Sequence, residues 1–124
     1  MSKLLVDTNV VLRYLLCDNE EQSQIAKDII EGGAFILPEV LIEASHVLRT
    51  FYRIDRQTIA TQLLIVLDWV EVEHKEVMIR AVEIFSETNL DFVDCILAAY
   101  HSVDKIEVFT FDKKLNNQLK QEEK

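Results

Sequence analysis

The stretch LLVDTN, residues 4–9, decides the fold that the sequence predicts. A short apolar run ends at an acidic residue, and apolar residues at helical spacing begin directly after it. We interpret residues 4–6 as a buried strand that delivers Asp7 to the end of a sheet. Asp7 is also a good N-cap for the following helix, although Thr8 or Asn9 could cap that helix instead.

Short apolar runs alternate with helical patterns along the rest of the chain. Strands that alternate with helices need crossover connections, which favours a parallel sheet covered on both faces. We therefore expect an α/β fold, a three-layer α/β/α sandwich around a short parallel sheet of four to five strands. The other expected strands are 34–37, 70–73 and 106–110, and the expected helices are 10–17, 20–31, 38–52, 56–68, 74–86, 91–103 and 112–119.

Length and charge bound the possible classes of protein. A chain of 124 residues fits one domain, which we expect over residues 1–119, followed by a polar, frayed tail over residues 120–124. Asp and Glu outnumber Lys and Arg by 22 to 13, so the net charge is −9. Because affinity for phosphate comes from Lys and Arg, this charge opposes nucleic-acid binding unless cations intervene.

Cysteine usage and hydropathy indicate an intracellular protein. Cys17 and Cys95 lie far apart within apolar helical patterns, so we expect both to be small buried residues. The first apolar run is too short for a signal peptide, and no run approaches the ~20 residues of a membrane span. The expected location is therefore the cytoplasm, with no membrane partner.

Five acidic residues occupy comparable places relative to the expected strands. Asp7 and Asp112 follow the first and last strands, Asp91 and Asp94 share a face at the start of one helix, and Glu43 lies in the helix after the second strand. Functional groups gather at the carboxyl ends of parallel strands, so we expect these carboxylates to converge. Crowded carboxylates need a positive charge between them, and oxygen-bound Mg²⁺ or Mn²⁺ supplies it. Such sites cleave phosphodiesters with metal-activated water.

Each acid also has an ordinary structural interpretation. Asp91 and Asp112 stand where helices begin, where Asp is a favoured N-cap. Taken singly, capping is the better interpretation for Asp91 and an equal one for Asp112. Glu43 lies mid-helix without Lys or Arg at i+3 or i+4, so neither a cap nor a helical ion pair explains it. Its ordinary interpretation is a solvated surface glutamate, which we favour less than a role in the site.

The ordered set of these segments resembles a PIN-domain ribonuclease, most closely a VapC-type toxin of a toxin–antitoxin pair. The resemblance covers essentially the whole chain, through residues 5–13, Glu43 with residues 47–48, residues 91–99 and residues 110–115. It implies a catalytic, metal-binding quartet of Asp7, Glu43, Asp94 and Asp112, a further metal ligand at Asp91, orienting roles for Thr8, Asn9 and Thr110, and RNA-phosphate contacts from Arg13 and Lys113.

The resemblance also implies an activity and partners. The expected activity is Mg²⁺- or Mn²⁺-dependent endonucleolytic cleavage of RNA by the toxin of a type II toxin–antitoxin system. The expected partners are RNA, a second copy in a homodimer, and an antitoxin whose tail occupies a groove between helices. The alternatives are a non-toxin PIN nuclease in RNA processing and a non-catalytic acidic module that binds RNA or protein. A phosphatase of the haloacid-dehalogenase kind ranks lower, because it needs an acid where Asn9 stands.

Overall fold

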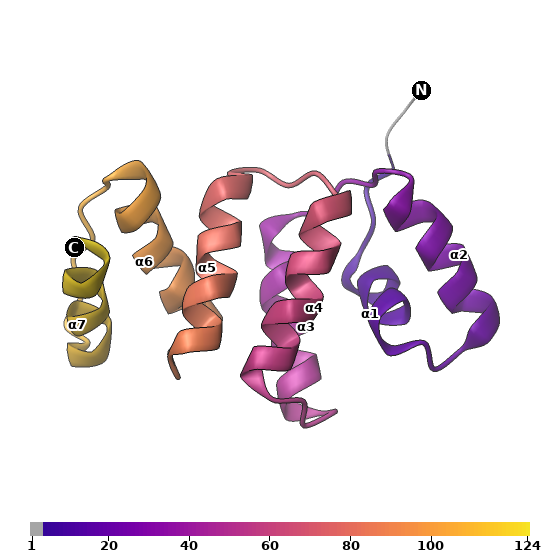
Figure 1. The fold of residues 1–124 in the computed structure, drawn as a ribbon, viewed down its shortest axis with the longest axis horizontal. Helices are drawn as coiled ribbons and strands as arrows, with labels where there is room; N and C mark the ends of the chain where they lie inside the picture. The colour runs from indigo at the N-terminus through magenta and orange to yellow at the C-terminus, as the bar shows by residue number, and fades with distance from the viewer. Residues whose placement is uncertain (1–3) are drawn as a thin grey trace. The chain divides into compact units, whose positions relative to one another are not determined.

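The computed structural model describes residues 4–124 and contains seven helices within them (Figure 1). All seven expected helices are confirmed, with ends that differ from the expected ones by three residues at most. The chain forms two compact units, one up to Glu73 and one over His74–Lys124, and each is described by itself. The helices are α1 (Thr8–Leu16), α2 (Glu20–Glu31), α3 (Pro38–Thr50), α4 (Arg56–Trp69), α5 (Lys75–Glu87), α6 (Phe92–Asp104) and α7 (Lys113–Glu122).

The predicted α/β/α sandwich is wrong, because residues 4–124 contain no sheet. Two isolated parallel bridges join Phe35 to Leu5 on one side and to Glu71 on the other. The Phe35 N–H donates to Leu4 O at 2.7 Å, and the Val6 N–H donates to Phe35 O at 3.0 Å. Apolar runs of three or four residues are shorter than a typical strand of five or six, so they support single bridges and no ladder.

The first and the last of the expected strands also differ from the prediction. Leu4 and Leu5 are 57% and 61% exposed, so the first apolar run is not a buried strand. Residues 106–110 pair with no strand in the described part of the chain, although they are rich in β-branched and aromatic residues as a strand is. Such a composition favours an extended segment, but only a neighbouring strand makes it part of a sheet.

The first unit has a helical core. Helix α1 packs against α2 and α3, and α4 packs against α3 and α2. Val11, Ile30, Leu41 and Leu48 are fully buried there. Helix α2 ends as predicted at its two glycines, because Gly33 adopts a φ of 96°, which L side chains rarely tolerate.

In the second unit, α6 packs against both α5 and α7 (Figure 1). Leu115 and Leu119 are the buried side chains of α7, so its apolar anchor is small. A charged anchor adds to it, because Arg80 of α5 donates from Nε and Nη2 to the two carboxylate oxygens of Glu122, both at 2.8 Å. The expected frayed tail is therefore helical and attached as far as Glu122.

The structure tests the predicted burial of the two cysteines. Cys95 is fully buried as expected, whereas Cys17 is exposed, because it stands after the last turn of α1 with a left-handed φ of 52°. No helix between residues 4 and 124 combines the length and the apolar character that a bilayer crossing requires.

His101 connects α6 to the segment after it and to the end of α7. Its Nδ1 lies 2.8 Å from Ile106 O, and its Nε2 lies 2.7 Å from Glu123 Oε2. These two acceptors, the carbonyl first and then the carboxylate, raise the pKa of His101, while nearby Lys105 opposes them. The protonated ring can donate to both acceptors at once, so the folded chain favours it.

This arrangement predicts a pH-dependent stability. A His whose pKa is raised on folding stabilises the fold below its unfolded pKa of about 6.5, and this stabilisation is lost as the pH rises through the folded pKa. We expect the His101→Gln variant to show a smaller fall in thermal midpoint between about pH 6 and pH 8 than the parent chain. Thermal melts followed by circular dichroism measure the difference, and equal pH slopes would contradict the prediction.

Candidate functional site

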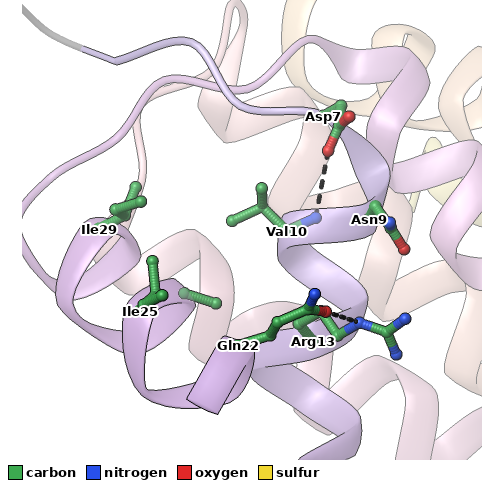
Figure 2. Close-up of a pocket in the computed structure, with 8 residues that line it drawn as sticks. Asp7, Asn9, Val10, Arg13, Gln22, Ile25 and Ile29 are labelled. Atoms are coloured by element: carbon green, nitrogen blue, oxygen red, sulfur yellow. Dashed lines mark hydrogen bonds between the residues drawn. The ribbon is translucent and has the colours of Figure 1, made fainter. Parts of the chain in front are cut away.

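Asp7 is positioned by the start of α1. Its backbone is extended, and its Oδ1 accepts a hydrogen bond from the Val10 N–H at 3.2 Å (Figure 2). Asp7 is therefore the N-cap, and Thr8 and Asn9, which could have capped, do not. Capping uses one lone pair of Oδ1 and leaves Oδ2 free to bind a cation. Thr8 is buried and Asn9 is exposed.

Asp7 and Glu43 line the same pocket of the first unit. The pocket has a volume of about 430 Å³, and Thr8 and Glu39 also line it. Glu43 is exposed on α3 and forms no ion pair within residues 4–124. The burial of Leu41 and Ala44 fixes which side of α3 faces the core and so holds Glu43 at its margin. The first unit thus brings together two of the predicted acids.

The other three acids interact in the second unit. Burial of Asp94, followed by the negative charges of Asp91 and Asp112, raises the pKa of the Asp94 carboxyl, and Lys114 opposes this rise. Asp91 holds the N-cap position of α6, but its side chain makes no capping hydrogen bond. The capping interpretation favoured for Asp91 is therefore wrong. Asp112 does cap α7, since its Oδ2 accepts from the Leu115 N–H at 3.1 Å.

Thr110 organises the segment that leads into α7. Its hydroxyl oxygen accepts a hydrogen bond from the Asp112 N–H at 3.0 Å, and its carbonyl accepts one from Asn116 Nδ2 at 3.0 Å. These bonds fix the backbone at Asp112, which is the kind of support that an orienting residue gives. Lys113, the first residue of α7, is exposed.

Arg13 is largely engaged within the protein. Its Nη1 lies 2.9 Å and 3.1 Å from the two carboxylate oxygens of Asp18, and its Nε donates to Gln22 at 2.7 Å (Figure 2). An RNA phosphate would have to share the guanidinium with these partners.

A second pocket of the first unit lies beside Arg13. It has a volume of about 290 Å³ and lies between α1 and α2, with side chains of both helices in view (Figure 2). The exposure of Ile25 in its wall, 53%, was not expected from the sequence. The apolar stripe of α2 indicated only core positions, and no local signal separates a groove residue from a buried one. Its lining residues are Asp7, Asn9, Val10, Arg13, Gln22, Ile25, Ala26 and Ile29.

The acids fit a hard divalent cation by their chemistry. Within residues 4–124 no three His, Cys, Asp or Glu side chains gather closely enough to hold a metal ion by themselves. Mg²⁺ commonly uses only one or two carboxylates and keeps several waters, so it does not need such a gathering. Carboxylate oxygens without His or Cys are the donors that Mg²⁺ and Mn²⁺ prefer.

Comparison with known proteins identifies the family. The model of the PIN domain family matches residues 4–118, nearly the full length of the chain. The chain belongs to the PIN-domain family, whose members are generally nucleases and typically use divalent metal ions. The family predicted from the sequence is thereby confirmed. Comparison with curated proteins and with solved structures finds no match.

Proposed function

We propose that this chain is a divalent-metal-dependent endoribonuclease whose catalytic acids are Asp7, Glu43, Asp94 and Asp112. One observation carries the proposal: in a chain of a nuclease family, Asp94 lies partly buried within the electrostatic reach of Asp91 and Asp112. Like charges so arranged disfavour ionisation, and a bound cation removes that penalty.

Each acidic side chain has a proposed role in binding the cation. Asp94, with Asp91 and Asp112, supplies carboxylate oxygens that attract a cation, and Thr110 holds the Asp112 backbone in place. In the first unit, Asp7 keeps Oδ2 free while Oδ1 is tied to Val10. These carboxylates would hold Mg²⁺ or Mn²⁺, which would supply an activated water and a positive charge facing the phosphodiester. That positive charge would also offset the repulsion between the RNA phosphates and a chain of net charge −9.

We also propose the finer assignment to the toxin of a type II toxin–antitoxin pair, a cytoplasmic homodimer with a protein antitoxin. The resemblance to VapC-type toxins supports it. The pocket between α1 and α2 supports it too, because its apolar wall, which includes Val10, Ile25 and Ile29, suits a short segment with apolar side chains. Growth arrest on expression of the chain, absent for a variant that cannot cleave RNA, tests the toxin role. Undisturbed growth with active nuclease would favour RNA processing instead.

A matched pair of variants tests the catalytic assignment of Glu43. We expect Glu43→Gln to lower Mg²⁺-dependent RNA cleavage by about 100-fold or more, because it removes a charged metal ligand. Glu39→Gln removes a carboxylate from the same pocket, one helical turn earlier, and should change the rate by less than about threefold. The measurement is the single-turnover cleavage rate of labelled RNA, with EDTA as the metal-free control.

Equal losses in the two variants would refute a specific role for Glu43. Binding of RNA by the parent chain without any cleavage would support the non-catalytic binding module.

A further inference from the structure

A pocket in the second unit has a chemistry that the proposed catalytic acids do not explain. It has a volume of about 210 Å³ and lies between the loop before α6 and one side of α7. None of the 22 acidic residues of the chain lines it. Its lining consists of one cation, four carboxamides, a hydroxyl and a leucine: Lys114, Asn89, Asn117, Gln118, Gln121, Thr88 and Leu90.

Helical spacing gathers most of these side chains. Lys114, Asn117, Gln118 and Gln121 stand at i, i+3, i+4 and i+7, so they share one side of α7. Leu115 and Leu119, which are buried, hold the helix in place beside them. An ordinary polar helix face would be convex, whereas here the loop before α6 lines the other side, so that this side of α7 forms one wall of a shallow, open pocket.

Three of the carboxamides remain available to a ligand. Gln118 donates to Glu122 at 2.8 Å, so it is engaged within the protein. Asn89, Asn117 and Gln121 are exposed, and their side chains have no hydrogen-bond partner within residues 4–124. Each carboxamide offers both a donor and an acceptor, the combination that pairs with the edge of a nucleobase.

The pocket adjoins the acidic residues of the second unit. Leu90 directly precedes Asp91, and Lys114 acts electrostatically on Asp94. A ligand in the pocket would therefore lie near these carboxylates, and Lys114 would be within electrostatic reach of both. The volume is below the ~300 Å³ of small-molecule sites, so it suits a small planar group and not a whole nucleotide chain.

We infer that this pocket binds one unpaired base of the RNA, next to the bond that is cut, with Lys114 on the adjoining phosphate. The inference rests on the proposed nuclease function and adds to it a base-recognition site that is separate from the catalytic acids. Base edges are open to such readout in single strands and not in the A-form duplex, whose major groove is too deep and narrow for side chains.

The test compares two variants of the full chain. The double variant Asn117→Ala/Gln121→Ala removes two available carboxamides from exposed helical positions, where Ala is well tolerated. Gln57→Ala removes an exposed carboxamide from α4, outside the pocket, and serves as the control. Cut sites in an RNA with a randomised single-stranded region are sequenced in Mg²⁺, and binding of the same RNA is measured in an Asp94→Asn background.

The parent chain should prefer one base at one position near the cut by about five- to 150-fold, the range of a good two-point contact to a base. The double variant should lose this preference and bind the RNA at least about fivefold more weakly, while Gln57→Ala keeps both. An unchanged preference in the double variant, or a flat profile in an active parent chain, would overturn the inference and leave the nuclease intact. Binding that depends on the pocket without cleavage by the parent chain would refute the nuclease and keep the pocket.

Discussion

Asp94→Asn is expected to lower Mg²⁺-dependent RNA cleavage by about 1,000-fold or more and to raise the thermal midpoint by about 1–3 °C. The loss follows from the proposed role of Asp94 as a charged oxygen ligand, and the gain follows from removing a carboxylate whose ionisation is disfavoured by burial, Asp91 and Asp112. A like-charged pair at helical spacing costs about 0.2–0.5 kcal/mol. The start of α6 favours a negative charge, but the raised pKa of Asp94 indicates that this attraction is outweighed.

The size of the stability change depends on pH. The pKa of Asp94 is raised in the folded chain, so its contribution to stability is greatest when the carboxyl is protonated and is lost as the pH rises through that pKa. The Asn variant should lack this loss, so its advantage should vanish in acid. Asp104→Asn, on the exposed far end of the same helix, is the control for activity.

Measurements of Mg²⁺ binding separate the effect of Asp94→Asn on cleavage from its effect on thermal stability. Millimolar Mg²⁺ should raise the thermal midpoint of the parent chain, because a ligand that binds only the folded state stabilises it, and EDTA should reverse the rise. The Asp94→Asn chain should respond more weakly. Full cleavage by Asp94→Asn would refute the assignment, whereas a lower midpoint together with lost cleavage would indicate a structural role.

Helices were predictable from this sequence because their signals are local. Apolar spacing of three and four residues, Pro38 at the start of α3 and the glycine pair after α2 each act within one or two turns. The strands were not predictable in the same way. A run such as residues 4–6 has strand composition, but the sheet depends on partners distant in sequence, and here Phe35 provides one bridge on each side and no ladder.

The sequence indicated candidate acids for the site but not their local geometry. The acids were found from their places after apolar runs, and Asp7 and Glu43 do share a pocket. The residue that caps each helix was not predictable, because Asp, Thr and Asn at neighbouring positions have similar capping strengths. Asp7 caps where Thr8 could have done so, and Asp91 does not cap although its position suits it. The carboxamide pocket carried no sequence signal, because Asn and Gln on a terminal helix read as a solvated face.

Arg80→Met is expected to destabilise the second unit by about 2–3 kcal/mol. It leaves the Glu122 carboxylate, whose side chain is 4% exposed, without its two charged hydrogen bonds. Breaking a fully buried pair costs about 3–5 kcal/mol, and the 28% exposure of Arg80 reduces this through solvent screening. Although burial opposes it, hydrogen bonds from Arg80 and Gln118 lower the pKa of Glu122, which shows that the carboxylate depends on these donors.

The loss should concentrate in α7, because Leu115 and Leu119 are its only buried apolar side chains in the described part of the chain. Urea unfolding measures the free energy, and amide hydrogen exchange locates the opening. Glu83→Gln is the matched control, since it removes a more exposed partner of the same guanidinium, at 3.1 Å. Arg80→Lys should recover only part of the stability, because an ammonium cannot reproduce the two parallel hydrogen bonds.

Amides of α7 that exchange no faster in Arg80→Met than in Glu83→Gln would contradict the proposed role of the Arg80–Glu122 ion pair in holding α7. If this ion pair holds α7, the substitution affects Asp112 as well, because Asp112 caps the same helix. Cleavage by Arg80→Met should then need more Mg²⁺ than cleavage by Glu83→Gln, whereas an unchanged Mg²⁺ dependence would confine Arg80 to stability alone.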